Sequence, residues 1–197
     1  MGPFGPLTFL NGPPTPRLYR ATMEDAAYLL CLRNDPTTVA ASRKQRPVEK
    51  AEHLAWLTAA LLDPAISLYI AAYSPDRSRV GTVRLDHGEC PDGCATELSL
   101  TVAPLMRGKG LARQLILLAM DANPYQCRRW IAEVRRENIP SLRAFLSAGW
   151  LIDGVDRDGL VFLVHERIQE ITPRGILEAQ AELRAGLGQP YEWGVLE

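Results

Sequence analysis

The residues 107–112, Arg-Gly-Lys-Gly-Leu-Ala, combine the residue types that bind a diphosphate. They stand before an apolar-striped helix, where unpaired main-chain N–H groups and the helix dipole favour an anion. Gly108 and Gly110 permit unusual backbone angles and lack the side chain that would keep a phosphate away from the amides. Lys109 adds a positive charge, and Arg107 adds another from the edge. The segment therefore predicts a pyrophosphate site.

The spacing excludes two common kinds of phosphate loop. A dinucleotide-binding fingerprint needs a third glycine three residues after the second, and Arg113 occupies that place. A P-loop needs four residues between its glycines and a Gly-Lys-Ser/Thr ending, which this segment lacks. A purely structural turn from strand to helix stays open as an alternative.

Hydrophobic periodicity predicts the elements that position this segment. Leu111, Leu115, Leu118 and Ala122 form the buried stripe of the helix that follows it. Three consecutive strands come before it, and they favour an antiparallel meander. The predicted strands are residues 17–21, 67–73, 80–86, 95–102, 130–134 and 160–165, with turns at 74–79 and 87–93. The predicted helices are residues 22–34, a second from Pro47, a third from 111 to about 123, and a fourth at 140–148, with a loop at 37–46.

Length and composition indicate one ordinary globular domain. The chain has 197 residues and a formal net charge of -1, without the basic excess of a nucleic-acid-binding protein. No stretch approaches the ~20 apolar residues that span a bilayer, and the N-terminus lacks the order of a secretory signal. We therefore expect a cytoplasmic protein that binds neither nucleic acid nor membrane. Cys90 and Cys94 are the only close pair of thiols, and no second pair follows at a zinc-binding spacing, so we expect free thiols and no metal.

Two segments of the chain resemble the GNAT superfamily of N-acetyltransferases. Residues 107–112 match the motif Arg/Gln-x-x-Gly-x-Gly/Ala of that family residue for residue, and residues 98–104 stand where the family has its central strand. Residues 138–150 look like the family's Asn-x-x-(Ala/Ser)…Gly-(Phe/Tyr/Trp) segment. The order of the predicted elements is also that of the family, so the resemblance spans residues 17–167.

The resemblance implies a fold and a domain organisation. The fold is an α/β (α+β) domain with a mixed, mostly antiparallel central sheet of about six to seven strands flanked by helices. This domain would cover residues 17–167, after a flexible N-terminal segment at 1–16. A C-terminal helical extension would follow at 168–197, with Thr172 as its cap. That helix would pack either on its own domain or on a second copy in a homodimer.

The resemblance also implies acetyl-CoA as co-substrate, without a metal. The strand ending at Val102 would pair its main chain with the pantetheine arm, and Asn138 would be a polar contact near the sulfur. An N-terminal helix cap is the alternative role for Asn138. The CoA pyrophosphate would be held by Arg107, Gly108, Lys109, Gly110, Leu111 and Ala112.

The chemistry of acetyl transfer needs a base, because an amine must lose a proton as it attacks a thioester. Glu97 lies five residues before Val102, where many relatives carry a glutamate in the acceptor cleft. Strand alternation places Glu97, Ser99 and Thr101 on one face. We therefore expect Glu97 to accept the proton directly or through water; the alternative is an ordinary exposed glutamate on a strand.

The family's usual acid is missing. A tyrosine normally stands seven residues after the asparagine, and this chain has Phe145 there. A phenyl ring donates no proton, so the thiolate must receive one from solvent or from another group. Tyr125 and Tyr73 are the substitutes to consider, although each has an alternative structural role.

The acceptor side resembles one subgroup of the family. The residues 32–35, Leu-Arg-Asn-Asp, together with Glu52, His53 and Trp56, look like those of enzymes acting on 4-amino nucleotide sugars. They resemble more loosely the enzymes that acetylate ribosomal-protein N-termini. Asn34 and His53 are the candidate substrate-binding residues, with a surface or packing role as the alternative for His53 and a core role for Trp56.

Three hypotheses on function stay open. The first is an acetyltransferase that acts on the primary amine of a small molecule, such as an amino nucleotide sugar. The second is a protein or peptide N-terminal acetyltransferase, which needs an open groove. The third is a non-catalytic CoA-binding module, which the phenylalanine at position 145 keeps open.

Overall fold

A computed structural model describes residues 15–74, 76–90, 93–123 and 129–166. The contacts within the chain divide it into two units, Met1–Glu166 and Arg167–Glu197, and the described residues all belong to the first. The expected C-terminal helix and most of the expected N-terminal segment lie outside the described residues. So does Tyr125, one of the candidate acids.

A mixed sheet of seven strands forms the centre of the domain, in the order β1-β2-β3-β4-β5-β7-β6. Neighbouring strands are antiparallel throughout, except that β4 and β5 run parallel. This architecture confirms the predicted fold class. The strands are β1 Pro16–Arg20, β2 Ile66–Tyr73, β3 Arg79–Cys90, β4 Gly93–Val102, β5 Arg129–Arg135, β6 Leu151–Val155 and β7 Leu160–Glu166.

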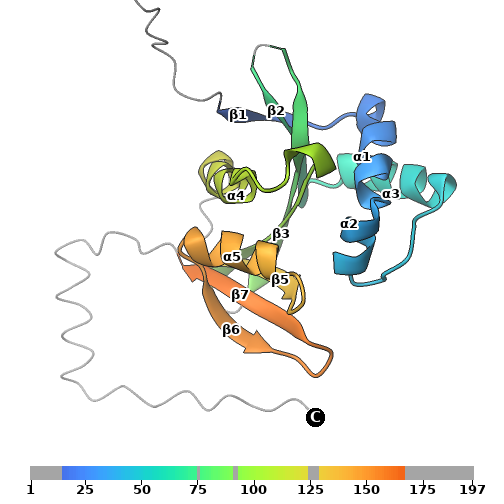
Figure 1. The fold of residues 1–197 in the computed structure, drawn as a ribbon. Coiled ribbons are helices and arrows are strands. Elements are labelled where there is room, and N and C mark those ends of the chain that lie inside the picture. The colour runs from blue at the N-terminus through green and yellow to red at the C-terminus, as the bar shows by residue number, and fades with distance from the viewer. Residues whose placement is uncertain (1–14, 75, 91–92, 124–128, 167–197) are drawn as a thin grey trace, which may run out of the picture. The chain divides into compact units, whose positions relative to one another are not determined.

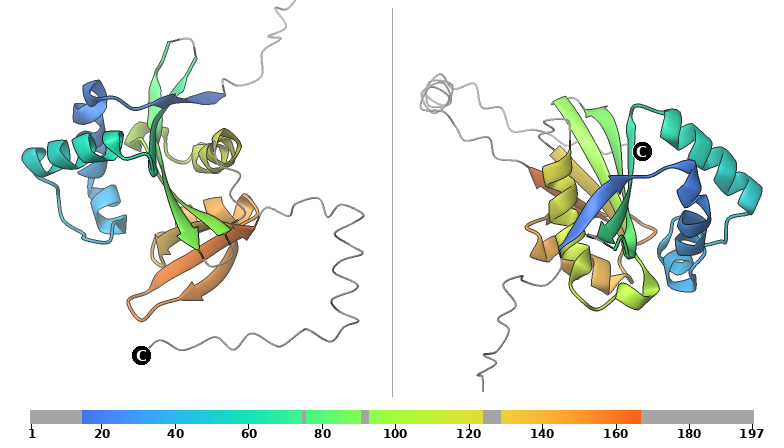
Figure 2. Two further views of the ribbon diagram at one scale, coloured as in Figure 1. Left: turned by 180° about the vertical axis from the view of Figure 1, so that it is seen from behind. Right: turned by 90° about the horizontal axis from the view of Figure 1, so that it is seen from above.

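Helices cover both faces of the sheet. The views in Figures 1 and 2 place α1, α2 and α3 on one face and α4 and α5 on the other. The helices are α1 Ala26–Arg33, α2 Pro36–Ala41, α3 Lys50–Leu62, α4 Leu111–Ala122 and α5 Ile139–Ser147, with short 3-10 turns at Met23–Asp25 and Pro104–Met106.

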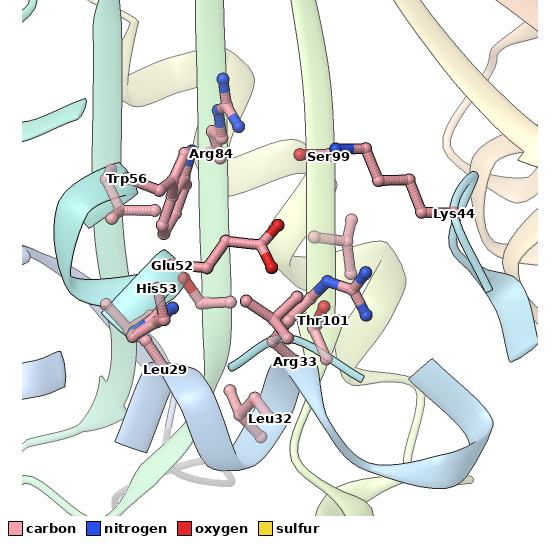
Figure 3. Close-up of a pocket in the computed structure, with 14 residues that line it drawn as sticks. Leu29, Leu32, Arg33, Lys44, Glu52, His53, Trp56, Arg84, Ser99 and Thr101 are labelled. Atoms are coloured by element: carbon pink, nitrogen blue, oxygen red, sulfur yellow. The ribbon is translucent and has the colours of Figure 1, made fainter. Parts of the chain in front are cut away.

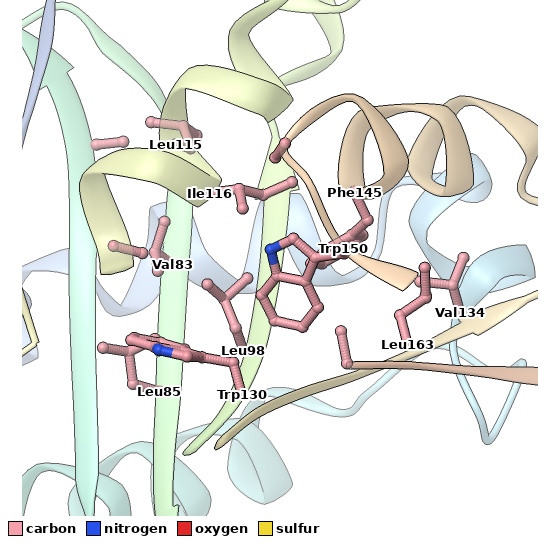
Figure 4. Packing of buried hydrophobic residues seen from close by; sticks show 14 of the residues in the cluster. Val83, Leu85, Leu98, Leu115, Ile116, Trp130, Val134, Phe145, Trp150 and Leu163 are labelled. Carbon is pink, nitrogen blue, oxygen red and sulfur yellow. The ribbon is translucent and has the colours of Figure 1, made fainter. Parts of the chain in front are cut away.

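The larger hydrophobic core lies between the sheet and the α4–α5 face. Helix α4 buries Leu111, Leu115, Ile116 and Ala119. Leu111 and Leu115 of the predicted stripe are thus confirmed, whereas the prediction is wrong for Ala122, which is exposed, and Leu118 is only half-buried. In Figure 4, the Trp150 indole lies in the middle of this core. A smaller core on the opposite face joins α1 and α3 to β2, through Leu29, Leu57, Leu68 and Ile70. The two cores fix the sheet between its helical layers.

The expectation of a loop at residues 37–46 is wrong, because α2 occupies the first part of it. The Asp35 side chain accepts a hydrogen bond from the main-chain N–H of Thr38 at 3.1 Å, and Pro36 is the first helical residue. The same Asp-Pro pair thus ends α1 and starts a new helix. Helix α3 then begins at Lys50, later than the predicted start at Pro47.

Two strand predictions also need correction. The segment 87–93 was expected to be a turn, but β3 continues to Cys90 and β4 begins at Gly93. Strand β6 was not predicted. It is an edge strand whose Leu151, Ile152 and Val155 side chains are all exposed, so it has no alternation of buried and exposed positions that could reveal it.

Gly81 lies where β3 approaches the end of β4, and this contact leaves no room for a side chain. A Cβ at this position would lie 2.3 Å from the carbonyl oxygen of Thr101. We expect Gly81→Ala to lower the free energy of unfolding by about 1–3 kcal/mol, because β4 must move to admit the methyl group. Urea denaturation measures the change.

Gly154→Ala is the matched control, because nothing lies within 4 Å of a Cβ at that position. Its free energy of unfolding should stay within about 0.5 kcal/mol of the parent or rise. Equal unfolding midpoints for the two variants would show that the close approach of β3 and β4 at Gly81 does not affect the free energy of unfolding.

Candidate functional site

Strands β4 and β5 separate soon after they meet. Their ladder contains only the pairs Ala95↔Arg129, Thr96↔Trp130 and Glu97↔Ile131. Strand β4 continues to Val102 while β5 continues to Arg135, and these later residues form no ladder with each other. The β5-facing edge of residues 98–102 therefore offers main-chain groups with which an extended ligand can pair.

The predicted phosphate segment follows the end of β4 and leads into α4. Gly108 and Gly110 have φ values of +75° and +73°, in the left-handed region that glycine tolerates best. Open space stands where either residue would carry a Cβ. No described residue accepts a hydrogen bond from the main-chain N–H groups of residues 108–110, and the first N–H groups of α4 have no acceptor within the helix. The segment thus presents a cluster of free donors.

The two cations of the segment differ in their contacts. Lys109 is exposed, and among the described residues its ammonium approaches only the Met106 sulfur, at 3.6 Å. Arg107 instead donates to the carbonyl oxygen of Val102 at 3.2 Å, to Asp35 Oδ1 at 2.6 Å and to the Thr38 hydroxyl at 3.3 Å. Arg107 therefore joins the end of β4 to the start of α2, while Lys109 is available to an anion.

Asn138 begins α5. Its side-chain oxygen accepts a hydrogen bond from the main-chain N–H of Ser141 at 3.3 Å, so it caps the helix as the alternative interpretation expected. Its amide nitrogen donates to no described residue. The cap and a contact with a ligand are compatible, because they use different atoms of the side chain.

A cavity of about 350 Å³ lies on the α1–α3 face of the sheet. Helices α1 and α3 form one wall, and strands β2, β3 and β4 form the other (Figure 3). It shares Leu100 and Thr101 with the part of β4 that has no β5 partner. The cavity and the open edge are therefore adjacent features of one strand.

His53 lines this cavity, but it is buried and one of its ring nitrogens is used in a hydrogen bond within the fold. Only 3% of the residue is exposed, and its Nε2 lies 3.0 Å from the carbonyl oxygen of Ala26. Since a carbonyl accepts, Nε2 carries the proton. Burial lowers the pKa of His53 below its usual value, so the ring is neutral at pH 7. His53 thus links α3 to α1 and presents an uncharged ring to the cavity.

Asn34 does not line the cavity, but it shapes the wall. Its side-chain nitrogen donates to the carbonyl oxygen of Val48 at 2.9 Å, and its side-chain oxygen accepts from the Val48 N–H at 2.8 Å. Val48 itself lines the cavity. Asn34 therefore fixes the chain just before α3 against the end of α1.

Glu97 lies at the last residue pair before β4 and β5 separate. It is half-buried, and strand alternation puts it on the face of Ser99 and Thr101, which line the cavity. Glu97 itself is not among the lining residues. The candidate base thus lies at the point where β4 and β5 begin to separate, two residues before Ser99, which lines the cavity.

Phe145 belongs to the core. It is 3% exposed and meets the Trp150 ring edge-on, with 4.8 Å between the ring centroids. The residue at the position of the family's acid therefore has a packing role in this chain. Tyr73, the other described candidate, packs beside the same core and is half-buried.

Two charged residues of the cavity, Lys44 and Arg84, were not identified from the sequence, and Arg33 was noted only as part of the segment 32–35. The position of Arg84 on one face of β3 could have been predicted, because Thr82, Arg84 and Asp86 alternate with buried residues along that strand. The position of Lys44 could not have been predicted, because it lies in a segment between helices that has no periodic pattern.

The family is decided by a match of residues 25–150 to the model of the acetyltransferase (GNAT) family. The chain belongs to this family. It is therefore an N-acetyltransferase, an acyltransferase of the GNAT class. A search of curated proteins finds no match.

Solved structures with the same fold include several acetyltransferases. Spermidine N-acetyltransferase from Vibrio cholerae, in complex with CoA and spermine, has a TM-score of 0.69 and 17% identity over 77% of this chain and 95% of its own. AAC(6')-Ib in complex with parmomycin and acetyl-CoA has a TM-score of 0.67 and 19% identity over 78% of this chain and 94% of its own. A domain from Methanocaldococcus jannaschii DSM 2661 has a TM-score of 0.68 and 17% identity over 79% of this chain and all of its own. At these identities the likeness concerns the fold.

The described part of this GNAT domain shows neither a membrane-spanning helix nor a cluster of metal-binding side chains. None of its described helices is long and apolar enough to cross a membrane. Within the same residues, no group of three or more His, Cys, Asp or Glu side chains is arranged to hold a metal ion. The side chains of Cys90 and Cys94 fall outside the description, so their predicted state is not tested.

The ion pair between Asp35 and Arg107 gives a prediction about stability and pH. The hydrogen bond from Arg107 holds the pKa of the Asp35 carboxyl below its usual value. Its stabilisation is therefore present above the unfolded-state pKa of about 4 and is lost as pH falls through the lower folded-state pKa. We expect Asp35→Asn to lower the free energy of unfolding at pH 7 by about 1–3 kcal/mol.

Denaturation at several pH values measures this difference, which should shrink below pH ~4 as the parent loses the ion pair. Asp158→Asn is the control, because its exposed carboxylate contacts no described residue. A difference that stays constant down to pH ~2 would contradict the assignment of the effect to a charged Asp35.

Proposed function

We propose that this enzyme transfers an acetyl group from acetyl-CoA to the primary amine of a small molecule, with a 4-amino nucleotide sugar as the leading candidate. One observation carries the proposal. The open edge of β4 at residues 98–102 joins a cluster of free N–H donors at its end to a cavity beside it. A long cofactor with a phosphate end and a reactive end fits that arrangement.

The cofactor is proposed to lie along β4. The N–H groups of residues 108–112 hold its pyrophosphate with the help of Lys109, and the edge of residues 98–102 pairs with the pantetheine arm. Asn138 then contacts the arm near the sulfur through its amide nitrogen. This placement brings the thioester toward the cavity, because Leu100 and Thr101 belong to both.

The transfer is a direct attack on the thioester. The nitrogen–carbon bond forms, the carbon–sulfur bond breaks, and the electron pair of that bond leaves on the CoA sulfur. Glu97 accepts the proton that the amine loses, directly or through one water molecule. Phe145 donates no proton, so the sulfur takes one from solvent or from another group.

The shape of the acceptor site supports a small molecule. Leu32, Arg33, Glu52, His53 and Trp56, which carry the resemblance to enzymes for amino nucleotide sugars, line one cavity. Its volume of about 350 Å³ is within the ordinary range for small-molecule sites. A protein N-terminal acetyltransferase and a non-catalytic CoA-binding module are the competing functions.

Gly110→Val tests the cofactor site. A valine at φ +73° is strained, and its side chain would stand in the space left for the phosphates. We expect at least ~10-fold weaker CoA binding by calorimetry, equivalent to about 1.4 kcal/mol. Gly154→Ala, which lies in β6, should bind CoA as the parent does. Failure of the parent to bind CoA or acetyl-CoA would overturn the proposed function.

Glu97→Gln tests the base. We expect kcat to fall by ~10²–10⁴-fold, with little change in CoA binding, because the isosteric amide cannot accept the proton. CoA release with a panel of amino nucleotide sugars, amino acids and N-terminal peptides is the measurement, repeated across pH. Unchanged turnover at every pH would remove Glu97 from the mechanism, and CoA binding without turnover of any amine would favour the non-catalytic module.

A further inference from the structure

The charged residues of the acceptor cavity are mostly cationic. Its lining holds Arg33, Lys44 and Arg84, and Glu52 is its one acidic residue. Glu52 is already paired, since its two oxygens accept from Arg46 at 3.0 and 2.9 Å. The lining therefore has more positive charge than it needs to balance its own carboxylate.

Arg84 is also paired. Its Nε donates to Asp86 Oδ1 at 3.0 Å, and its guanidinium lies over the Trp56 ring at 5.5 Å from the centroid. These contacts hold Arg84 against the wall between β3 and α3. They account for its position without any ligand.

Arg33 and Lys44 have no such contacts, although their charges, after that of Arg46, help to lower the pKa of Glu52. Neither makes an ion pair or a hydrogen bond with a residue of the described part of the chain. The Nη1 atom of Arg33 is shielded from solvent and has no hydrogen-bond partner among the described residues. A buried guanidinium nitrogen without a partner is costly, and an anion beside it would remove that cost.

The two side chains point to the same wall of the cavity. In Figure 3, the Arg33 guanidinium lies toward Thr101 and the Lys44 side chain reaches toward Ser99, both on β4. Arg33 is the last residue of α1, where a cation also interacts favourably with the helix dipole. That interaction alone would be satisfied by a side chain in solvent, and it does not explain a guanidinium that lines a cavity.

The chain around Lys44 is held in place from β5. Arg135 donates to the carbonyl oxygens of Ser42 at 3.1 Å and Arg43 at 3.0 Å, and Arg43 pairs with Glu133. On its other side the segment is fixed by the hydrogen bonds between Asn34 and Val48 described above. Lys44 thus stands on a segment that is anchored at both ends.

We propose that the acceptor of this enzyme is an amine that also carries an anionic group, a phosphate or a carboxylate, and that Arg33 and Lys44 bind that group. This rests on the proposed acetyl transfer to an amine. The anionic group held at these two cations orients the rest of the acceptor along β4, toward the open edge where the thioester is proposed to lie. A polyamine, which brings further positive charge to the same wall, is excluded by repulsion.

The first experiment compares matched acceptors in the CoA-release assay. The panel is glucosamine 6-phosphate, glucosamine, UDP-4-amino sugar, glutamate and spermine. We expect kcat/KM for the phosphorylated or carboxylated amines to exceed that for glucosamine by at least ~10-fold, and spermine to be inactive. The phosphate and carboxylate arms tell which anion is recognised. A kcat/KM no higher for any of the phosphorylated or carboxylated amines than for glucosamine, or spermine as the best acceptor, would overturn the proposal.

The second experiment changes the two cations. Arg33→Gln and Lys44→Gln should each raise KM for the best anionic acceptor by ~10-fold or more, a change of about 1.4 kcal/mol, with a smaller change in kcat. The matched controls are Arg143→Gln on α5 and Lys50→Gln at the start of α3, because both side chains are exposed and lie outside the cavity. An unchanged KM in both cavity variants, with CoA binding intact, would contradict the assignment.

A third measurement separates this proposal from the proposed activity. Calorimetry with UDP-glucose, glucose 6-phosphate and succinate, none of which has an amine, reports anion binding without turnover when saturating CoA occupies the cofactor site. Binding that is lost in Arg33→Gln and Lys44→Gln supports the anion site even where no amine is acetylated, and in that case only the transfer function fails. No binding by any of the three probes in the parent would overturn the anion site, even if some other amine is acetylated.

Discussion

The separation of β4 from β5 after three residue pairs is the constraint on which the site depends. A parallel pair that continued would satisfy its own main-chain groups and leave nothing for a ligand. Because the strands part at Glu97, the remaining edge of β4 is open, and the turn at Pro104–Met106 and the glycine segment then lead from its end into α4. The N–H donors of residues 108–112 and the cavity beside Leu100 are thus both placed by one strand.

The acceptor side is attached to both sides of this gap. Arg107, which follows the turn after β4, donates to Asp35 at the start of α2. Arg135 on β5 donates to the carbonyl oxygens of Ser42 and Arg43 just after α2. The segment that carries Lys44 into the cavity is therefore connected to β4 through α2 and to β5 directly. These contacts therefore connect the wall of the cavity to both of the strands that separate at Glu97.

The elements with a regular pattern could be predicted from the sequence, and the contacts between distant elements could not. The apolar stripe of α4 and the glycines before it share a local rule, since a helix start with unencumbered donors needs only neighbouring residues. Helix α2 was missed because Asp35 and Pro36 both stop one helix and start another. Lys44 and Arg84 come from a segment between helices and from a strand, and they meet Arg33 only because the sheet and α1 are packed together. The positive charge that these three residues bring to the cavity depends on the fold, and it could not be predicted from their spacing in the sequence.

The packing of Phe145 bears on how the reaction ends. Its ring is enclosed with Trp150 in the core, so a tyrosine hydroxyl at this position would need a partner in an apolar environment. A thiol has an unperturbed pKa of about 8.5, so a released thiolate takes a proton from water at pH 7 without any protein group. A positioned acid accelerates the departure of the sulfur but does not determine the final equilibrium. In the proposed reaction the released thiolate is therefore protonated without any contribution from the side chain at position 145.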